Sequence, residues 1–255
     1  MVKDSVALVT GGASGIGLAT VEQLLENNAR EVYIVDINQE NGENALKTLG
    51  KKYGNDRVKF LKLDVTNLED FRNIFEKIIK ESGRVDILIN NAGVLVGDKV
   101  LDINIGGVLN GLKLAMIFMK KGSKIINTAS KAGLRGQGQC AEYIASKHAV
   151  VGLTKAFSAS YWYDKTQISV MAICPGMTES PLVHTIPNTE ANQDLIKFFN
   201  ILRKTAQLTE SVAKSMVTIL KVGKNGSFWI SEDNKLFEIE FPVYTDLIKR
   251  EVPFF

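Results

Sequence analysis

The chain has 255 residues, a length that one sheet with helices on both faces can bury as a single domain. Hydrophobic residues make up 45%, charged residues 23%, and the mean hydropathy is +0.02, which excludes a disordered chain and a membrane-embedded bundle. The net charge of +3 is carried by scattered side chains, with nothing denser than pairs such as Lys51-Lys52. We therefore expect no nucleic-acid partner and no membrane anchor.

Cysteine usage and hydropathy also limit where the protein works. Cys140 and Cys174 are too few for a disulfide framework or a thiolate metal site, so we expect no metal and a reducing compartment. No apolar run approaches the ~20 residues of a membrane-spanning helix, and the first residues do not resemble a secretory leader. The sequence predicts a cytoplasmic protein, in which Asn225-Gly226-Ser227 is a tight turn rather than a glycosylation site.

Short apolar runs alternate with amphipathic stretches up to about residue 175. Helix periodicity is clear at 15–28 and 68–80, where apolar side chains recur on one side. The expected strands are Val6 to Val9, Val32 to Val35, Val58 to Leu63, Ile87 to Ile89, Lys124 to Asn127 and Ile168 to Ile173. This alternation predicts an α/β fold: a single-domain, Rossmann-type doubly wound parallel sheet with helices on both faces.

The pattern loosens after Pro175-Gly176. Residues of about 4–175 are expected to form the dinucleotide-binding and catalytic core of the one domain, 1–255. Residues of about 176–255 would supply a substrate loop, helices at 195–202 and 210–220, a final strand at 228–230 and a tail. On such a scaffold the looser part selects the substrate, and we expect residues 180–208 to lie over it as a lid. The apolar side chains expected in that lid are Ile186, Phe198, Phe199 and Leu202.

A glycine-rich loop, Thr10 to Gly17, lies between the first strand and the first helix. Its glycines permit a tight turn and close approach of the backbone to a pyrophosphate, while the helix N-terminus offers unpaired N–H groups. Asp36, at the end of the second strand, lies near the ~20-residue offset from the loop at which a carboxylate binds ribose hydroxyls. That carboxylate would repel a 2′-phosphate, so the sequence predicts NAD rather than NADP.

These residues resemble the short-chain dehydrogenase/reductase family, whose fingerprint is the Thr-Gly-x-x-x-Gly-x-Gly spacing of Thr10 to Gly17. The resemblance continues at Asp64-Val65, Asn90-Asn91-Ala92-Gly93 and Pro175-Gly176, and spans about residues 4–180. It implies that Asp64 binds the adenine amino group, that the Asn90 to Gly93 segment lines the adenosine half, and that Pro175-Gly176 passes the nicotinamide.

A tyrosine can act as the base of an alcohol oxidation if nearby positive charge lowers its pKa. Tyr143 and Lys147 share one helix face, but Tyr161 and Lys165 have the same spacing. Ser130 favours the first pair because it follows a strand at the sheet edge where ligands bind, thirteen residues before Tyr143, which is also the interval of the family. Tyr161 is then interpreted as core or interface packing on the same helix, and His148 and His184 as surface or pocket-lining residues.

The resemblance assigns roles to this set of residues. Ser130 would bind the substrate oxygen, Tyr143 would be the acid/base, and Lys147 would lower the Tyr143 pKa and bind ribose, so that oxidation speeds up with rising pH. Asn104 would distort its helix locally and hold a water that links Lys147 to solvent. Thr178 or Ser180 would bind the carboxamide, since serine stands where the family often has threonine.

The complete set of predicted site residues falls into three groups. The catalytic residues are Asn104, Ser130, Tyr143 and Lys147. The cofactor-binding residues are Gly11, Ser14, Gly15, Ile16, Gly17, Asp36, Ile37, Asp64, Val65, Asn91, Ala92, Gly93, Tyr143, Lys147, Pro175, Gly176, Thr178 and Ser180. The substrate-pocket residues are Cys140, Met177, Leu182 and Ile186.

The span from Gly93 to Asn104 is short for the family, a feature shared by two of its subgroups, the insect alcohol dehydrogenases and the 15-hydroxyprostaglandin dehydrogenases. The expected function is therefore NAD-dependent oxidation of a secondary or allylic, apolar alcohol. The alternatives are an NADP-dependent carbonyl reductase and a non-catalytic NAD-binding sensor or scaffold.

Apolar residues on helices at about 105–120 and 142–163 exceed what one sheet face requires. They belong either to the core or to an interface, and the family implies a homodimer or homotetramer with paired helices across a two-fold axis. The residues concerned are Met116, Phe118, Val150, Val151, Phe157, Tyr161 and Trp162.

Overall fold

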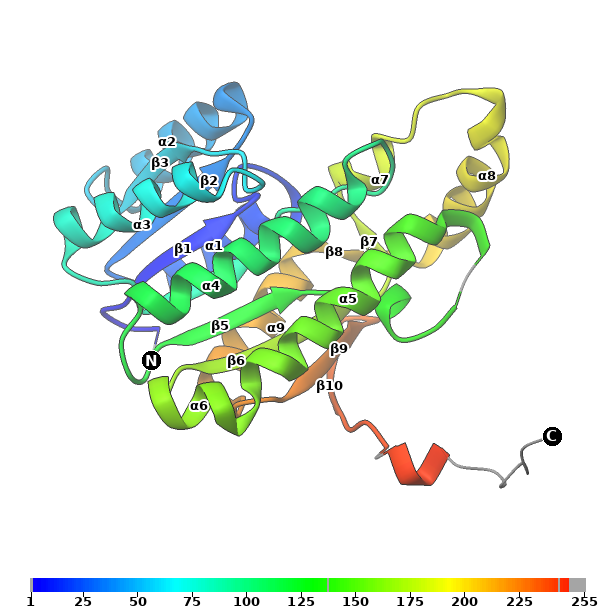
Figure 1. Ribbon diagram of the computed structural model, residues 1–255. Helices are drawn as coiled ribbons and strands as arrows, with labels where there is room; N and C mark the ends of the chain where they lie inside the picture. Colours follow the sequence, from blue (N-terminus) through cyan, green and yellow to red (C-terminus); the bar gives the residue numbers. More distant parts are fainter. Residues whose placement is uncertain (1, 137, 243, 248–255) are drawn as a thin grey trace.

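The computed structural model describes residues 2–136, 138–242 and 244–247 (Figure 1). A central sheet of eight strands has the order β10-β9-β6-β5-β4-β1-β2-β3, and every neighbouring pair is parallel except β9 and β10. The strands are β1 (Val6–Thr10), β2 (Glu31–Asp36), β3 (Val58–Lys62), β4 (Ile87–Asn90), β5 (Lys124–Thr128), β6 (Ser169–Pro175), β9 (Phe228–Glu232) and β10 (Lys235–Ile239). The predicted doubly wound α/β fold is confirmed.

Helices cover both faces of this sheet, so its central strands are almost completely buried (Figure 1). One apolar cluster joins α1 (Gly15–Glu26), α2 (Gln39–Tyr53) and α9 (Thr209–Val222) to the sheet. The other joins α3 (Leu68–Ser82), α4 (Val108–Phe118) and α5 (Ala141–Ser158) to the opposite face. The strand order changes direction between β1 and β4, and the crevice at such a point is where α/β sheets bind ligands.

An excursion that we call the arm, residues 180–206, leaves the body after β7 (Thr178–Glu179) and returns at β8 (Gln207–Leu208). These two short strands pair in parallel as a separate sheet. Between them lie α7 (Pro181–His184), α8 (Gln193–Leu202) and two single turns of 3-10 helix (Glu190–Asn192 and Arg203–Thr205). The arm therefore occupies the position predicted for the substrate lid.

The structure differs from the sequence prediction in two elements. The expected helix at 142–163 breaks at Ala159, whose extended backbone (φ −61°, ψ 156°) separates α5 from α6 (Ser160–Thr166). The chain after β9 turns back as strand β10, because Asp233 and Asn234 take positive φ angles of 51° and 59° and form a two-residue hairpin turn. Asn225-Gly226 forms the predicted turn, and the tail at 248–255 lies outside the described residues.

No helix in the part of the chain that the structure describes is long and apolar enough to cross a membrane.

Candidate active site

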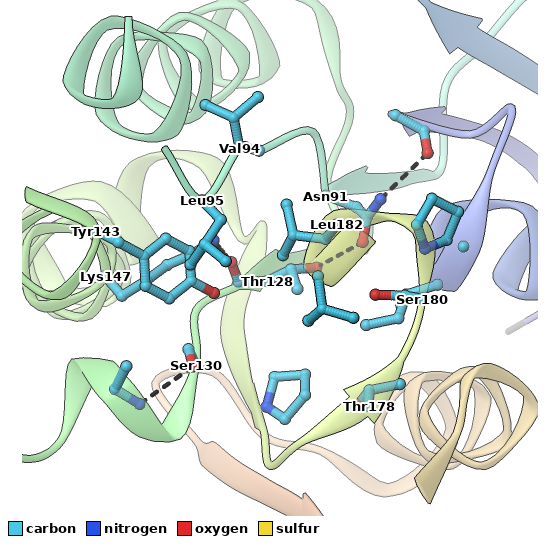
Figure 2. Close-up of a pocket in the computed structure, with 18 of the residues that line it drawn as sticks. Asn91, Val94, Leu95, Thr128, Ser130, Tyr143, Lys147, Thr178, Ser180 and Leu182 are labelled. Carbon is cyan, nitrogen blue, oxygen red and sulfur yellow. Dashed lines mark hydrogen bonds between the residues drawn. The ribbon is translucent and has the colours of Figure 1, made fainter. Parts of the chain in front are cut away.

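A cavity of about 450 Å³ lies at the carboxyl ends of the parallel strands (Figure 2). It extends from the glycine loop and Asp36 to α5 and the underside of the arm. Most of the predicted site residues line it: Gly11, Ser14, Gly15, Ile16, Asp36, Ile37, Asp64, Val65, Asn91, Ala92, Gly93, Ser130, Cys140, Tyr143, Lys147, Pro175, Gly176, Met177, Thr178, Ser180 and Leu182. Gly17, Asn104 and Ile186 do not line it.

The glycine loop is packed so tightly that side chains cannot replace its hydrogens. Gly11 has a φ of +61°, and a Cβ atom there would lie 2.9 Å from the Cα atom of Ala92. A Cβ atom on Gly17 would lie 2.0 Å from the carbonyl oxygen of Gly11. Gly17 thus lies behind the cavity wall, where it lets α1 begin close beneath the loop. Asn91 holds the loop from the other side by donating to the carbonyl oxygens of Thr10 (3.1 Å) and Gly11 (3.3 Å).

Two carboxylates stand at the end of the cavity near the glycine loop. Asp36 accepts hydrogen bonds from the backbone N–H groups of Ala13 (3.1 Å) and Asn38 (3.0 Å), which fix its orientation. Asp64 accepts from the backbone N–H (2.9 Å) and hydroxyl (2.7 Å) of Thr66, and these two bonds hold its pKa below the ordinary value. Both groups keep further lone pairs as acceptors for a ligand.

Ser130, Tyr143 and Lys147 form the opposite end. Ser130 follows β5, and its Oγ accepts from the backbone N–H of Ala132 (3.1 Å) at the start of a short turn. Tyr143 lies in the first turn of α5, and Lys147 lies one turn later, with its Nζ donating to the carbonyl of Thr128 (2.9 Å). In Figure 2 the hydroxyl groups of Tyr143 and Ser130 point toward the same part of the cavity. The three predicted residues are therefore brought together.

The predicted lowering of the Tyr143 pKa by Lys147 is wrong for this structure. Burial raises the pKa of Tyr143 to about 12, and the Ser130 hydroxyl offsets only part of this rise. The Nζ of Lys147 lies 5.6 Å from the centre of the Tyr143 ring. Burial also lowers the pKa of Lys147 to about 8, so the amine still carries a proton at neutral pH.

Asn104 lies behind the cavity in a π-helical turn (Asp102–Gly107) that precedes α4. Its side chain is fully buried, accepts from the backbone N–H of Val94 (2.8 Å), and donates to the carbonyl of Val94 (2.9 Å) and the hydroxyl of Ser146 (3.0 Å). The predicted local distortion of this helix is therefore present. Gly93 lies between Asn104 and the catalytic end. A Cβ atom on Gly93 would lie 3.1 Å from Asn104 Oδ1 and 3.5 Å from Lys147 Nζ.

The arm covers the catalytic end with apolar side chains. Of the predicted lid residues, Phe198, Phe199 and Leu202 line the cavity, beside Leu182 from α7. Ile186 does not; it borders a smaller pocket between α7 and α8, which shares Val183 and Phe199 with the main cavity. The predicted substrate residue Ile186 therefore lies outside the lining of the main cavity.

The alternative pair Tyr161 and Lys165 and the two histidines do not line this cavity. Tyr161 lies on α6 with 63% of its surface exposed, and the Nζ of Lys165 lies over its ring at 3.6 Å. It is not a core residue and does not share a helix with Tyr143. His148 is exposed on α5, and His184 pairs with Glu179 (2.7 Å) at the outside of the arm.

The sequence prediction missed several lining residues. Among them are Lys131, the neighbour of Ser130, and Glu232 with Asp233 from the hairpin between β9 and β10. The Asp233-Asn234 pair between two strand-like runs was the available signal for that hairpin. Nothing in the sequence indicated that it reaches the cavity.

Comparison with known proteins identifies the family. The short chain dehydrogenase family matches residues 5–191. The 15-hydroxyprostaglandin dehydrogenase (NAD(+)) of Macaca fascicularis is 34% identical in sequence, over 86% of this chain and 87% of the relative. Alcohol dehydrogenase 2 of Ceratitis capitata is 28% identical, over 93% of this chain and 95% of the relative. A crystal structure of levodione reductase aligns with a TM-score of 0.79 and 26% identity over 91% of this chain and 97% of that chain. The chain belongs to the short-chain dehydrogenase family.

The residues present fit a bound dinucleotide. The Gly11 cradle leaves no room for a side chain, the N-terminus of α1 begins beside it, and Asp36 lies at the same end of the cavity. The cavity then continues without interruption past Asn91 and Gly93 to Tyr143 and Thr178. One elongated ligand could therefore contact the glycine loop and the three hydroxyl-bearing or basic side chains of the catalytic end together.

Proposed function

We propose that this protein oxidises a secondary or allylic, apolar alcohol to a carbonyl compound with NAD. The observation that carries the proposal is one cavity lined by the glycine loop and Asp36 at one end and by Ser130, Tyr143 and Lys147 at the other. The relatives support it, because they include a 15-hydroxyprostaglandin dehydrogenase whose name specifies NAD(+) and an alcohol dehydrogenase.

The choice of NAD rests on Asp36. An ionised carboxylate accepts hydrogen bonds from ribose hydroxyls but repels the 2′-phosphate of NADP. Its backbone donors, Ala13 and Asn38, fix it against rotation away from that position. Residues 11–17, 64–65 and 91–93 would hold the adenosine and pyrophosphate parts, and 175–180 the nicotinamide part.

The proposed mechanism assigns one task to each catalytic side chain. Bound NAD supplies the hydride acceptor. Tyr143 must first lose its own proton; the resulting phenolate then takes the hydroxyl proton of the alcohol and becomes a phenol again, while Ser130 donates a hydrogen bond to the substrate oxygen. Lys147, protonated at neutral pH and fixed by the Thr128 carbonyl, keeps a positive charge at the catalytic end of the cavity and would hold a ribose hydroxyl of the dinucleotide. The apolar side chains of the arm, such as Phe198 and Leu202, exclude water from the reacting atoms.

A screen of primary, secondary and allylic alcohols with NAD, followed by NADH absorbance, tests this function. Replacing Tyr143 with Phe should lower kcat by about 10²- to 10⁴-fold while NADH still binds, as measured by its fluorescence. A loss of kcat much smaller than this would contradict the role of Tyr143. A wild-type protein that binds NADH but oxidises none of the alcohols would favour the sensor or scaffold, and a preference for NADPH with carbonyl compounds would favour the reductase.

We further propose a homodimer or homotetramer in the cytoplasm. Val150, Val151 and Phe157 are buried in the core of this chain and are not available to a partner. Ile117 on α4 and Tyr161 on α6 expose 61% and 63% of their surfaces on the side of the sheet that α4 and α5 cover. Light scattering at micromolar concentration tests the assembly, and a monomer would contradict it.

A further inference from the structure

The turn that carries Ser130 is held from two sides. We call residues 130–133 the catalytic turn. On one side Gly133 packs against α5, where a Cβ atom would lie 2.6 Å from the carbonyl oxygen of Lys147. On the other side the ammonium group of Lys131 forms an ion pair with Glu232, at the end of β9. The position of Ser130 therefore depends on both contacts.

Glu232 also contacts the strand end at Pro175-Gly176. A Cβ atom on Gly176 would lie 3.0 Å from Glu232 Oε1 and 3.3 Å from its Cβ, so the glutamate side chain lies directly over this glycine. The backbone N–H of Gly176 donates to the carbonyl of Ser231 (2.8 Å), which fixes the two strand ends together. One glutamate thus contacts both the segment that would hold the nicotinamide and the turn that would hold the substrate oxygen.

The strand that carries Glu232 is paired on both sides. It lies next to the two-residue turn Asp233-Asn234, and β9 pairs with β10 on one side and with β6 on the other. The side chains of Lys131 and Glu232 are only 25% and 35% exposed, and both line the cavity. A partly buried ion pair anchored on a sheet is less screened by solvent than one between two mobile surface side chains.

We propose that Lys131 and Glu232 are positioning residues, whose ion pair sets the placement of Ser130 relative to Pro175-Gly176. The inference rests on the proposed function, because this placement matters only if the two segments hold an alcohol and a dinucleotide. Hydride transfer requires close alignment of donor and acceptor, and a misplacement of about 1 Å can cost about a hundredfold in rate. Breaking the pair lowers kcat, whereas dinucleotide affinity depends mainly on the distant glycine loop and Asp36.

The test uses Lys131→Met, Glu232→Gln, the double variant, and the charge swap Lys131→Glu with Glu232→Lys. The control is the ion pair of Lys52 with Glu22 (2.7 Å), which joins α2 to α1 outside the cavity lining and is broken by Lys52→Met. The measurements are kcat and KM for the best alcohol, the Kd of NADH, and the thermal midpoint. Amide hydrogen exchange at Ala132 and Gly133 adds a readout that needs no activity.

We expect each single variant to lower kcat by about tenfold or more, with little change in the Kd of NADH and faster exchange in the catalytic turn. The double variant should lose no more than the worse single variant, the charge swap should recover most of the loss, and the control should keep its kcat. Wild-type kcat and exchange in both single variants would overturn the proposal, as would additive losses or a charge swap that recovers neither readout. If the wild-type protein oxidises no alcohol, the proposed function fails while the exchange measurements still test the ion pair.

Discussion

The frame of the molecule, residues 5–175, and the arm, residues 180–206, are built differently. Strands of the frame such as β1 and β4 are buried along their whole length, and two apolar clusters join them to helices on both faces. In the arm, α7 has no buried residue and α8 has one, Leu195. The groups proposed to do the chemistry therefore stand on the rigid part, while the side chains that face an apolar substrate stand on a lightly attached part.

Truncating one phenylalanine in each region gives the largest expected contrast. Phe71 of α3 is fully buried, so Phe71→Ala should lower the free energy of unfolding by about 3–5 kcal/mol in urea titrations. Phe198 of α8 is only partly buried and lines the cavity, so Phe198→Ala should cost well under half of that and raise KM for the alcohol. Equal losses of stability would show that the arm is as tightly integrated as the frame.

Burial of the Lys147 amine should make the free energy of unfolding depend on pH, because the folded chain holds this proton less tightly than the unfolded chain. Burial lowers its pKa from 10.5 to about 8, so above pH 10.5 the amine is neutral in both folded and unfolded chains, and this cost is absent. As pH falls toward 8, only the unfolded chain gains the proton, and stability is lost until the loss levels off below pH 8. The measured quantity is the free energy of unfolding of Lys147→Met minus that of the wild type, from urea titrations. This difference should be about 3 kcal/mol larger at pH 7 than at pH 10.5. A relative stability that is equal at both pH values would contradict this.

Replacing Asp36 tests whether a residue of the frame selects between NAD and NADP. Asp36→Ser removes the carboxylate that would repel a 2′-phosphate, so the preference for NADH over NADPH, measured as a ratio of Kd values, should fall by about tenfold or more. Asp64→Asn is the matched control, because Asp64 also lines the cavity at a strand end but is proposed to bind adenine. An unchanged ratio in the Asp36 variant would place the selection elsewhere.

Replacing Glu179 tests how the arm is attached to the frame, and we expect this substitution to have the smallest effect on KM and stability. Its carboxylate accepts two hydrogen bonds from Arg203 (3.0 Å each), at the far end of the arm, and one from His184 (2.7 Å), at the near end. Arg203 and His184 together hold the pKa of Glu179 below its ordinary value, so the contacts persist as pH falls into the usual carboxyl range. Glu179→Gln should raise KM for the alcohol a few-fold and leave the thermal midpoint nearly unchanged. Glu190→Gln, a change at an exposed site in the arm, should alter neither.

The frame was predictable because its signals are local. Apolar runs and helix periodicity located the strands β1 to β6. The spacing of the catalytic residues was informative because Ser130 follows a strand, while Tyr143 and Lys147 lie one turn apart on a helix. The break at Ala159 and strand β10 were missed because each depends on one or two backbone angles.

Long-range contacts set the remaining properties of the site. The raised pKa of Tyr143 follows from burial, which no spacing reveals. The contact of Lys131 with Glu232 joins residues 101 positions apart in the chain. Ile186 has the expected apolar character, but the direction of the chain after α7 takes it to a different pocket.

All strands of the central sheet except β10 run in one direction (Figure 1). The cavity lies at their carboxyl ends, so the starts of these strands lie at the opposite edge of the sheet. The first strand begins at Val6, and the described chain before it lies at the edge away from the cavity. A surface linkage or an affinity handle joined to the amino-terminal end would therefore leave the cavity mouth open to reagents. Immobilised protein prepared in this way suits the ligand-binding measurements described above.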